Sequence, residues 1–195
     1  TPVIRTQAHR LIEECMLCAN VCAAKFLKKN KIPALYRSHQ GPRQEKLDNL
    51  REFLGELGLG LPGGDDPSPK DFQGILSQTF GRPDASVIQT VILRSMNRAA
   101  YTPENDGHFG LNYAEYTHFT SPIRRYADLI VHRALIRAFN LGNDGLSDHE
   151  QSRLMQISED ISNTERTAVL AERDASDRYI ALYLSEQGAA QFAGR

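Results

Sequence analysis

Apolar residues recur at steps of three and four along most of the chain, which is the spacing of one face of an α-helix. Four helices are predicted from it, over residues 6–29, 43–56, 69–78 and 84–96. The second has clear boundaries, because Gly41-Pro42 precedes it and Gly58 follows it. Residues 32–36 lack the helical spacing and contain Pro33, so they are interpreted as a short extended segment.

Residues 147–187 contain no glycine or proline, which predicts a helical C-terminal region. Two capping boxes occur within it, Ser147-x-x-Glu150 and Ser162-x-x-Glu165. The second box is interpreted as a break between two consecutive helices. A serine in the interior of one unbroken helix is the alternative.

Residues 97–102 and 107–112 flank an Asp-Gly pair and are predicted to form a β-hairpin. The expected fold class is therefore α+β and mostly helical, with helices packed against a minor β-hairpin. Two short strands do not make a stable sheet alone, so the fold is expected to need further structure around it.

Composition narrows the class of protein without identifying a function. The 195 residues are 41% apolar and 24% charged, which is ordinary for one globular domain. A formal net charge of −1 gives no general electrostatic attraction to nucleic acid, so any such contact must be local. No apolar run approaches the ~18 residues of a membrane span, and the start does not resemble a signal peptide. The absence of an initiator methionine suggests a piece of a longer polypeptide.

Three cysteines lie within eight residues, an odd number that does not make a disulfide framework and that favours a reducing, cytoplasmic location. They belong to one helical stripe: Leu11, Cys15, Cys18, Cys22 and Phe26. We therefore predict that they are buried packing residues. We expect no metal, because a tetrahedral zinc site needs a fourth ligand and His9 is only a weak candidate.

The clearest local signal is the run around Ser121 and Pro122. Ser121 suits an N-cap and Pro122 suits the first position of a helix, which places Arg124 and Arg125 in the first turn. Cations are unfavourable there by ~0.3–1 kcal/mol each, so the arrangement indicates an anion site, and a phosphate is the anion that we expect. The alternative is a pair of surface arginines held by Asp128.

Residues 108–133, HFGLNYAEYTHFTSPIRRYADLIVHR, resemble the signature of the RNB catalytic domain of the ribonuclease II and ribonuclease R exoribonuclease family. Other segments resemble family motifs in the family's order: IEECMLCAN (12–20), ALYRSH (34–39), LPGG (61–64), LRSM (93–96), YTPEN (101–105) and AERD (171–174). Several of them are more similar to ribonuclease R than to ribonuclease II.

The resemblance implies that residues 1–195 are the C-terminal half of an RNB domain. It also implies processive 3′-to-5′ degradation of single-stranded RNA to nucleoside 5′-monophosphates, with Mg²⁺ held mainly by aspartates outside this chain. The aspartate-bearing half, the cold-shock domains and the S1 domain are absent, so the chain alone is expected to be inactive. Apolar faces of its first and last helices are expected to be exposed where the remaining polypeptide would pack.

Three side chains acquire roles from the family match. Arg124 resembles the arginine that contacts RNA phosphates near the scissile bond, and Glu172 resembles the acid that supports catalysis from the closing helix. Glu13 resembles the glutamate that recognises a ribose 2′-hydroxyl, with the adjacent Glu14 as the alternative.

Further residues around the same motif are expected to position RNA or the loop: Tyr116, His118, Ser121, Arg125 and Tyr126. For His118, a structural bond to the loop backbone is favoured over a role as general base. Two other classes of function stay open from the sequence. One is a non-catalytic RNA-binding or partner-docking module, and the other is a helical scaffold whose cysteines bind a metal or respond to redox state.

Overall fold

The computed structural model describes residues 4–188 and residue 191. In chain order its elements are α1 (Gln7–Lys29), β1 (Tyr36–Ser38), α2 (Gln44–Glu56), α3 (Pro69–Gln78), α4 (Ala85–Ser95), β2 (Ala100–Thr102), the 3₁₀-helix η1 (Phe109–Leu111), α5 (Tyr126–Phe139), α6 (Asp148–Ser152) and α7 (Leu154–Glu186). The expected class, mostly helical with a small antiparallel sheet, is confirmed. None of the described helices has both the length and the apolar character needed to cross a membrane.

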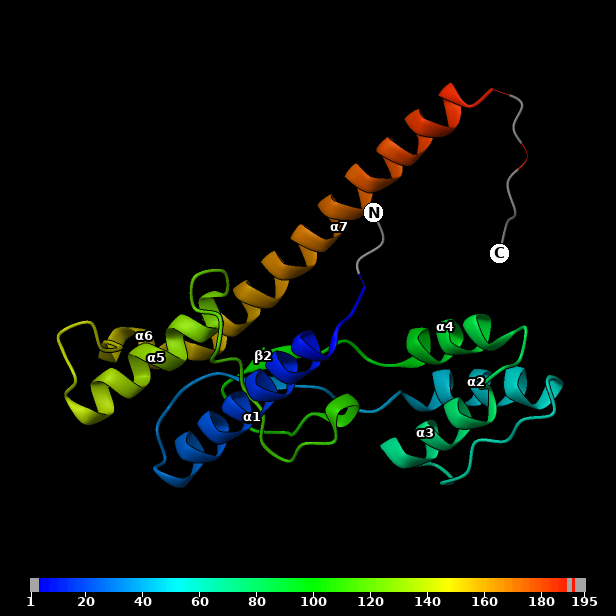
Figure 1. The fold of residues 1–195 in the computed structure, drawn as a ribbon. Coiled ribbons are helices and arrows are strands. Elements are labelled where there is room, and N and C mark those ends of the chain that lie inside the picture. The colour runs from blue at the N-terminus through cyan, green and yellow to red at the C-terminus, as the bar shows by residue number, and fades with distance from the viewer. Residues whose placement is uncertain (1–3, 189–190, 192–195) are drawn as a thin grey trace.

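The helices form two groups with separate cores (Figure 1). Helices α2, α3 and α4 pack around one core, to which Leu47, Leu54 and Ile88 contribute fully buried side chains. The other core joins α1, α5, the two strands and the start of α7. Phe109 of η1 packs against the first core and makes an edge-on contact with Phe72, 5.8 Å between ring centroids. The loop that carries η1 therefore connects the two groups.

The predicted hairpin between residues 97–102 and 107–112 is wrong. Strand β2 pairs instead with β1, antiparallel, with Arg37 opposite Tyr101. Residues 107–112 contribute an isolated bridge to His39 and then the turn of η1, where Phe109 N–H donates to the His39 carbonyl at 2.7 Å. A local turn signal was thus overridden by pairing between segments distant in the sequence.

The C-terminal region is helical as predicted, but its break lies elsewhere. The Ser147–Glu150 capping box is present and starts α6. Ser162 does not begin a new helix: its hydroxyl donates to the Ser158 carbonyl at 2.8 Å inside unbroken α7. The same oxygen accepts from the Tyr101 backbone N–H at 3.1 Å, so Ser162 ties β2 to α7. The predicted break is wrong, because the Ser162 hydroxyl accepts a hydrogen bond from a backbone N–H of β2 and not from the N–H groups at the start of a helix.

Helix α7 has 33 residues and is therefore about 50 Å long. Figure 1 shows its C-terminal half projecting beyond the rest of the molecule. Every described residue from Arg166 onward is exposed, among them several large apolar side chains: Val169, Leu170, Tyr179, Ile180, Leu182, Tyr183 and Leu184. The expectation of an uncovered apolar face on the last helix is confirmed.

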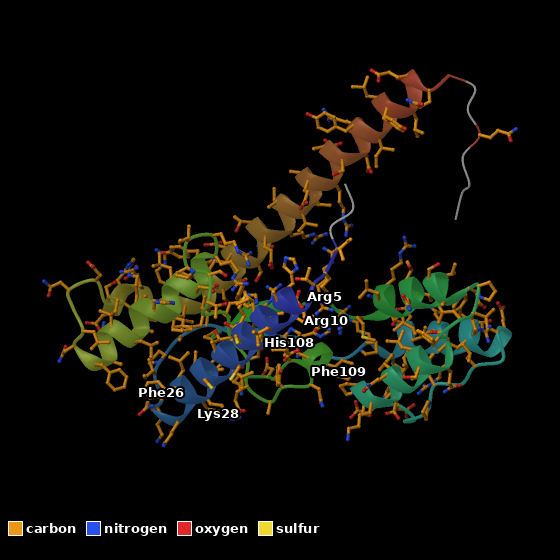
Figure 2. All side chains as sticks on the ribbon, in the orientation of Figure 1. Arg5, Arg10, Phe26, Lys28, His108 and Phe109 are labelled. Carbon is orange, nitrogen blue, oxygen red and sulfur yellow. The ribbon has the colours of Figure 1, made fainter. Side chains whose placement is uncertain are left out.

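Helix α1 begins after Thr6, as predicted, but it buries a different face from the one expected. Its buried residues are Asn20, Ala23, Ala24 and Leu27. All three cysteines are exposed free thiols, and their stripe neighbours Leu11 and Phe26 are 65% and 44% exposed. The prediction of buried cysteines is therefore wrong, because α1 packs on the core through the neighbouring face that carries Ala23, Ala24 and Leu27. Figure 2 labels Phe26 and Lys28 at one end of α1 and Arg5 and Arg10 at the other.

Candidate functional site

The arginine-bearing segment before α5 is a turn, not the first turn of a helix. The backbone N–H groups of Arg124 and Arg125 donate to the Ser121 carbonyl at 3.3 and 3.1 Å, and α5 begins at Tyr126 after Arg125 as N-cap. The prediction that Ser121 caps the helix and Pro122 opens it is wrong. The cations therefore precede the helix, and the first turn contains Asp128, an acid that suits the dipole there.

Asp128 is the anchor of this turn. Its side chain is fully buried, and Oδ1 accepts from the Ser121 backbone N–H at 2.7 Å. The Arg125 guanidinium donates to both carboxylate oxygens, at 2.8 and 2.9 Å. For Arg125, the alternative of a pair with Asp128 is thus what the structure shows. Arg124 is exposed and makes no side-chain hydrogen bond or ion pair within residues 4–188.

Arg124 and Glu172 line the same pocket, of about 450 Å³. Its walls come from the turn before α5, from β2 and from the middle of α7, and Tyr126 is also among the lining residues. Arg125 and Glu165 line it too, but each is bound to a partner of opposite charge. Arg124 and Glu172 are the pocket's charged side chains without an ion-pair partner in the described part of the chain. The structure therefore brings together the two residues that the sequence assigned to catalysis.

A network of side chains between β1, β2 and α7 lies beside the pocket and includes two of its lining residues, Tyr101 and Glu165. Arg37 donates to the two Glu165 carboxylate oxygens at 2.7 and 3.1 Å. Its guanidinium also lies over the Tyr101 ring, 4.5 Å from the centroid, a favourable cation–π contact. The Tyr101 hydroxyl in turn shares a 2.8 Å hydrogen bond with His118 Nδ1. Burial raises the pKa of Tyr101 to about 12, so this hydroxyl stays protonated at neutral pH.

His118 is a neutral, largely buried residue beside the pocket. Burial, reinforced by the nearby Arg125 and Arg37 cations, lowers the pKa of its imidazole to about 3. It does not line the pocket. The sequence predicted that His118 bonds the loop backbone. In the structure its hydrogen-bond partner is the Tyr101 hydroxyl.

The two glutamates expected to contact ribose lie outside the pocket. Glu13 lies on the exposed surface of α1, where it pairs with Arg5, and the Arg5 guanidinium lowers the pKa of its carboxyl. Neither Glu13 nor Glu14 lines the pocket with Arg124. The ribose contact assigned to Glu13 stays a prediction.

Sequence reasoning missed two lining residues of the pocket, Tyr101 and Glu165, and Arg37, which contacts both of them. Arg37 and Tyr101 lie inside family motifs, but nothing in their spacing indicated that they stack. Glu165 was interpreted as part of a helix cap, and it is bound to Arg37 instead. Only the pairing of β1 with β2 and the packing of α7 on β2 bring these residues together.

Comparison with protein-family models matches the RNB domain over residues 2–140. The chain belongs to the RNB domain family. Ribonuclease R of Escherichia coli (strain K12) is 46% identical over 181 residues, which are 89% of this chain and 22% of that protein. The chain thus spans less than a quarter of the length of this RNB relative. The resemblance derived from the motifs is confirmed at the level of the family.

Solved structures of other proteins share the fold. Mycoplasma genitalium RNase R in complex with ribose methylated single-stranded RNA has a TM-score of 0.85 and 33% identity, covering 95% of this chain and 30% of that one. Yeast Ssd1, described as a pseudonuclease, has a TM-score of 0.65 and 26% identity, covering 80% of this chain and 19% of that one. The solved structures that share the fold thus include one in complex with RNA and one described as a pseudonuclease.

Proposed function

We propose that this chain is part of a processive 3′-to-5′ exoribonuclease that hydrolyses single-stranded or structured RNA to nucleoside 5′-monophosphates. The observation that carries the proposal is the meeting of Arg124 and Glu172 at one pocket, although they are far apart in the sequence. The similarity to ribonuclease R and to a structure of that enzyme with RNA supports it.

In this proposal Arg124 binds the RNA phosphate next to the scissile bond. Its guanidinium is free of internal partners in residues 4–188. A planar guanidinium can donate two parallel hydrogen bonds to phosphate oxygens and can balance the charge that develops on them during hydrolysis. Glu172 lines the same pocket from α7, and in this proposal it supports the reaction from there. Tyr126, 49% exposed at the rim, is placed to contact RNA beside Arg124.

The family resemblance implies Mg²⁺, and the residues of this chain do not fit it by themselves. Within residues 4–188, no group of three or more His, Cys, Asp or Glu side chains is arranged to hold a metal ion. Mg²⁺ usually requires oxygen ligands in octahedral geometry. In the proposal the ligands therefore lie mainly in the remaining RNB polypeptide, which is the partner that completes the site.

The test compares the full-length polypeptide that contains this chain with the chain alone. Each is incubated with Mg²⁺ and a 5′-labelled single-stranded RNA, and a matched RNA with a blocked 3′ end serves as the control substrate. With the full-length protein only, we expect conversion of the labelled RNA to a short 5′ fragment without a ladder of intermediates, and release of nucleoside 5′-monophosphates measured by chromatography. Adding the upstream part of the RNB domain to this chain is expected to restore activity. Robust release by the chain alone would contradict the proposal that the metal ligands lie mainly outside it. No release by any preparation would contradict the proposal that the polypeptide is an exoribonuclease.

The alternative is a non-catalytic RNA-binding or partner-docking module derived from the same domain. The similarity to Ssd1, described as a pseudonuclease, is the specific observation that favours it. The same experiment separates the two functions. RNA binding in a filter or fluorescence assay, without monophosphate release by the full-length protein in Mg²⁺, would favour the module.

A further inference from the structure

We propose that Asp128 is a positioning residue for RNA hydrolysis: its buried carboxylate holds the Ser121–Arg125 turn in the one shape that directs the Arg124 guanidinium to the pocket. This inference rests on the proposed function of Arg124. From the sequence, Asp128 was considered only as an ion-pair partner for surface arginines.

Asp128 is hydrogen-bonded to residues on both sides of Arg124 in the sequence. One carboxylate oxygen binds the backbone N–H of Ser121, three residues before Arg124, at 2.7 Å. Both oxygens bind the Arg125 side chain, directly after Arg124, at 2.8 and 2.9 Å. Because Asp128 itself lies on helix α5, the two ends of the turn are attached to a rigid element.

Burial makes this attachment stronger than a surface ion pair. The Asp128 side chain is 0% exposed and that of Arg125 is 18% exposed. A buried carboxylate must have its hydrogen bonds satisfied, and here three donors satisfy it. Alternative shapes of the turn would leave that charge without partners, so they are disfavoured.

The segment leading into the turn is held by side chains from several elements. Asn20 of α1 donates to the Tyr116 hydroxyl at 3.1 Å and accepts from the Phe119 backbone N–H at 3.0 Å. The Thr117 hydroxyl donates to the Leu35 carbonyl at 2.6 Å. From α5, the ring of His132 stacks on that of Phe119, 4.4 Å between centroids. The whole stretch is irregular backbone held by these contacts, and the Asp128 hydrogen bonds continue them up to Arg124.

Asp128 cannot act on RNA directly in the way proposed for Arg124, because its side chain is buried and contacts only other residues of this chain. It does not line the pocket. A positioning residue of this kind acts through Arg124, so removing it matters only while Arg124 is present. A residue with a merely structural role would lower activity by the same factor in either background.

The experiment is a double-mutant cycle in the full-length polypeptide, with Arg124→Ala, Asp128→Asn and the double variant. The readout is the single-turnover rate of RNA hydrolysis, together with thermal unfolding of each protein. Asp128→Asn is nearly isosteric but loses an acceptor oxygen. We expect Arg124→Ala to slow hydrolysis about 100-fold or more. Asp128→Asn is expected to slow it about tenfold, and the double variant to stay within about threefold of Arg124→Ala.

Asp148→Asn is the matched control, since Asp148 pairs with Arg137 at the other end of α5 and is 91% exposed. It is expected to keep the wild-type rate. Arg125→Lys, which retains the charge but loses the two-point bond, replaces Asp128→Asn in the cycle if that variant fails to fold. If Arg124→Ala is slow and the rate losses of the two single variants multiply in the double variant, the positioning role of Asp128 is overturned, whereas the proposed function of Arg124 stands. An unchanged rate for Arg124→Ala overturns the proposed function and this role with it.

Discussion

Replacing Arg124 by lysine separates a role in binding phosphate from a role in folding. The Arg124 side chain is exposed and forms no side-chain hydrogen bond or ion pair within residues 4–188. Lysine retains the positive charge and the flexible aliphatic stem. We therefore expect Arg124→Lys to change the free energy of unfolding by less than about 0.5 kcal/mol, the range of ordinary surface substitutions.

The expected loss of activity is much larger. In the proposed role the guanidinium donates two parallel hydrogen bonds to phosphate oxygens, and an ammonium group cannot reproduce that geometry. Losing one such contact from a preorganised site removes ~2–4 kcal/mol of transition-state stabilisation. At 1.36 kcal/mol for each factor of ten, the rate should fall about 30- to 900-fold.

The assay is the single-turnover rate on 5′-labelled single-stranded RNA, measured with saturating full-length protein and Mg²⁺. Thermal unfolding of the same preparations reports stability. Arg166→Lys serves as the control, because Arg166 is an exposed arginine of α7 that does not line the pocket. A rate for Arg124→Lys within twofold of wild type, or a loss of activity matched by loss of folded protein, would refute the reasoning.

Two further predictions concern the described fold. The pKa of His118 is lowered to about 3 from 6.5, so its contribution to stability is full above pH 6.5 and declines as the pH falls from there toward 3. Acidification from pH 7 to 5 should cost on the order of 1–2 kcal/mol through this residue; thermal unfolding should show a weaker pH dependence in His118→Asn and an unchanged one in the exposed-site control His149→Asn. The exposed thiols of α1 should react with a thiol reagent in the native chain, and Cys18→Ser should change stability by less than about 0.5 kcal/mol; unreactive native thiols would contradict the assigned orientation of α1.

The sequence alone determined the mostly helical class, the approximate extent of the first four helices and the family, and it singled out Arg124 and Glu172. Helical spacing is a local property, and a cap such as Ser147 acts within one turn, so both could be recognised without a structure. Arg124 and Glu172 were found because each lies in a continuous motif. Their meeting in one pocket could only be expected through the family resemblance.

Only the tertiary structure decided which faces are buried and which segments pair. The stripe of cysteines satisfies every local criterion for a core face, yet α1 packs through Ala23, Ala24 and Leu27. Ser162 satisfies the criteria for a helix start, yet it binds the backbone of β2. The helix expected at Ser121 begins at Tyr126, because the buried carboxylate of Asp128 captures the Ser121 N–H and the Arg125 side chain. In each case a contact between surfaces or side chains outweighs local preferences worth about 1 kcal/mol, and such contacts leave no periodic signal in the sequence.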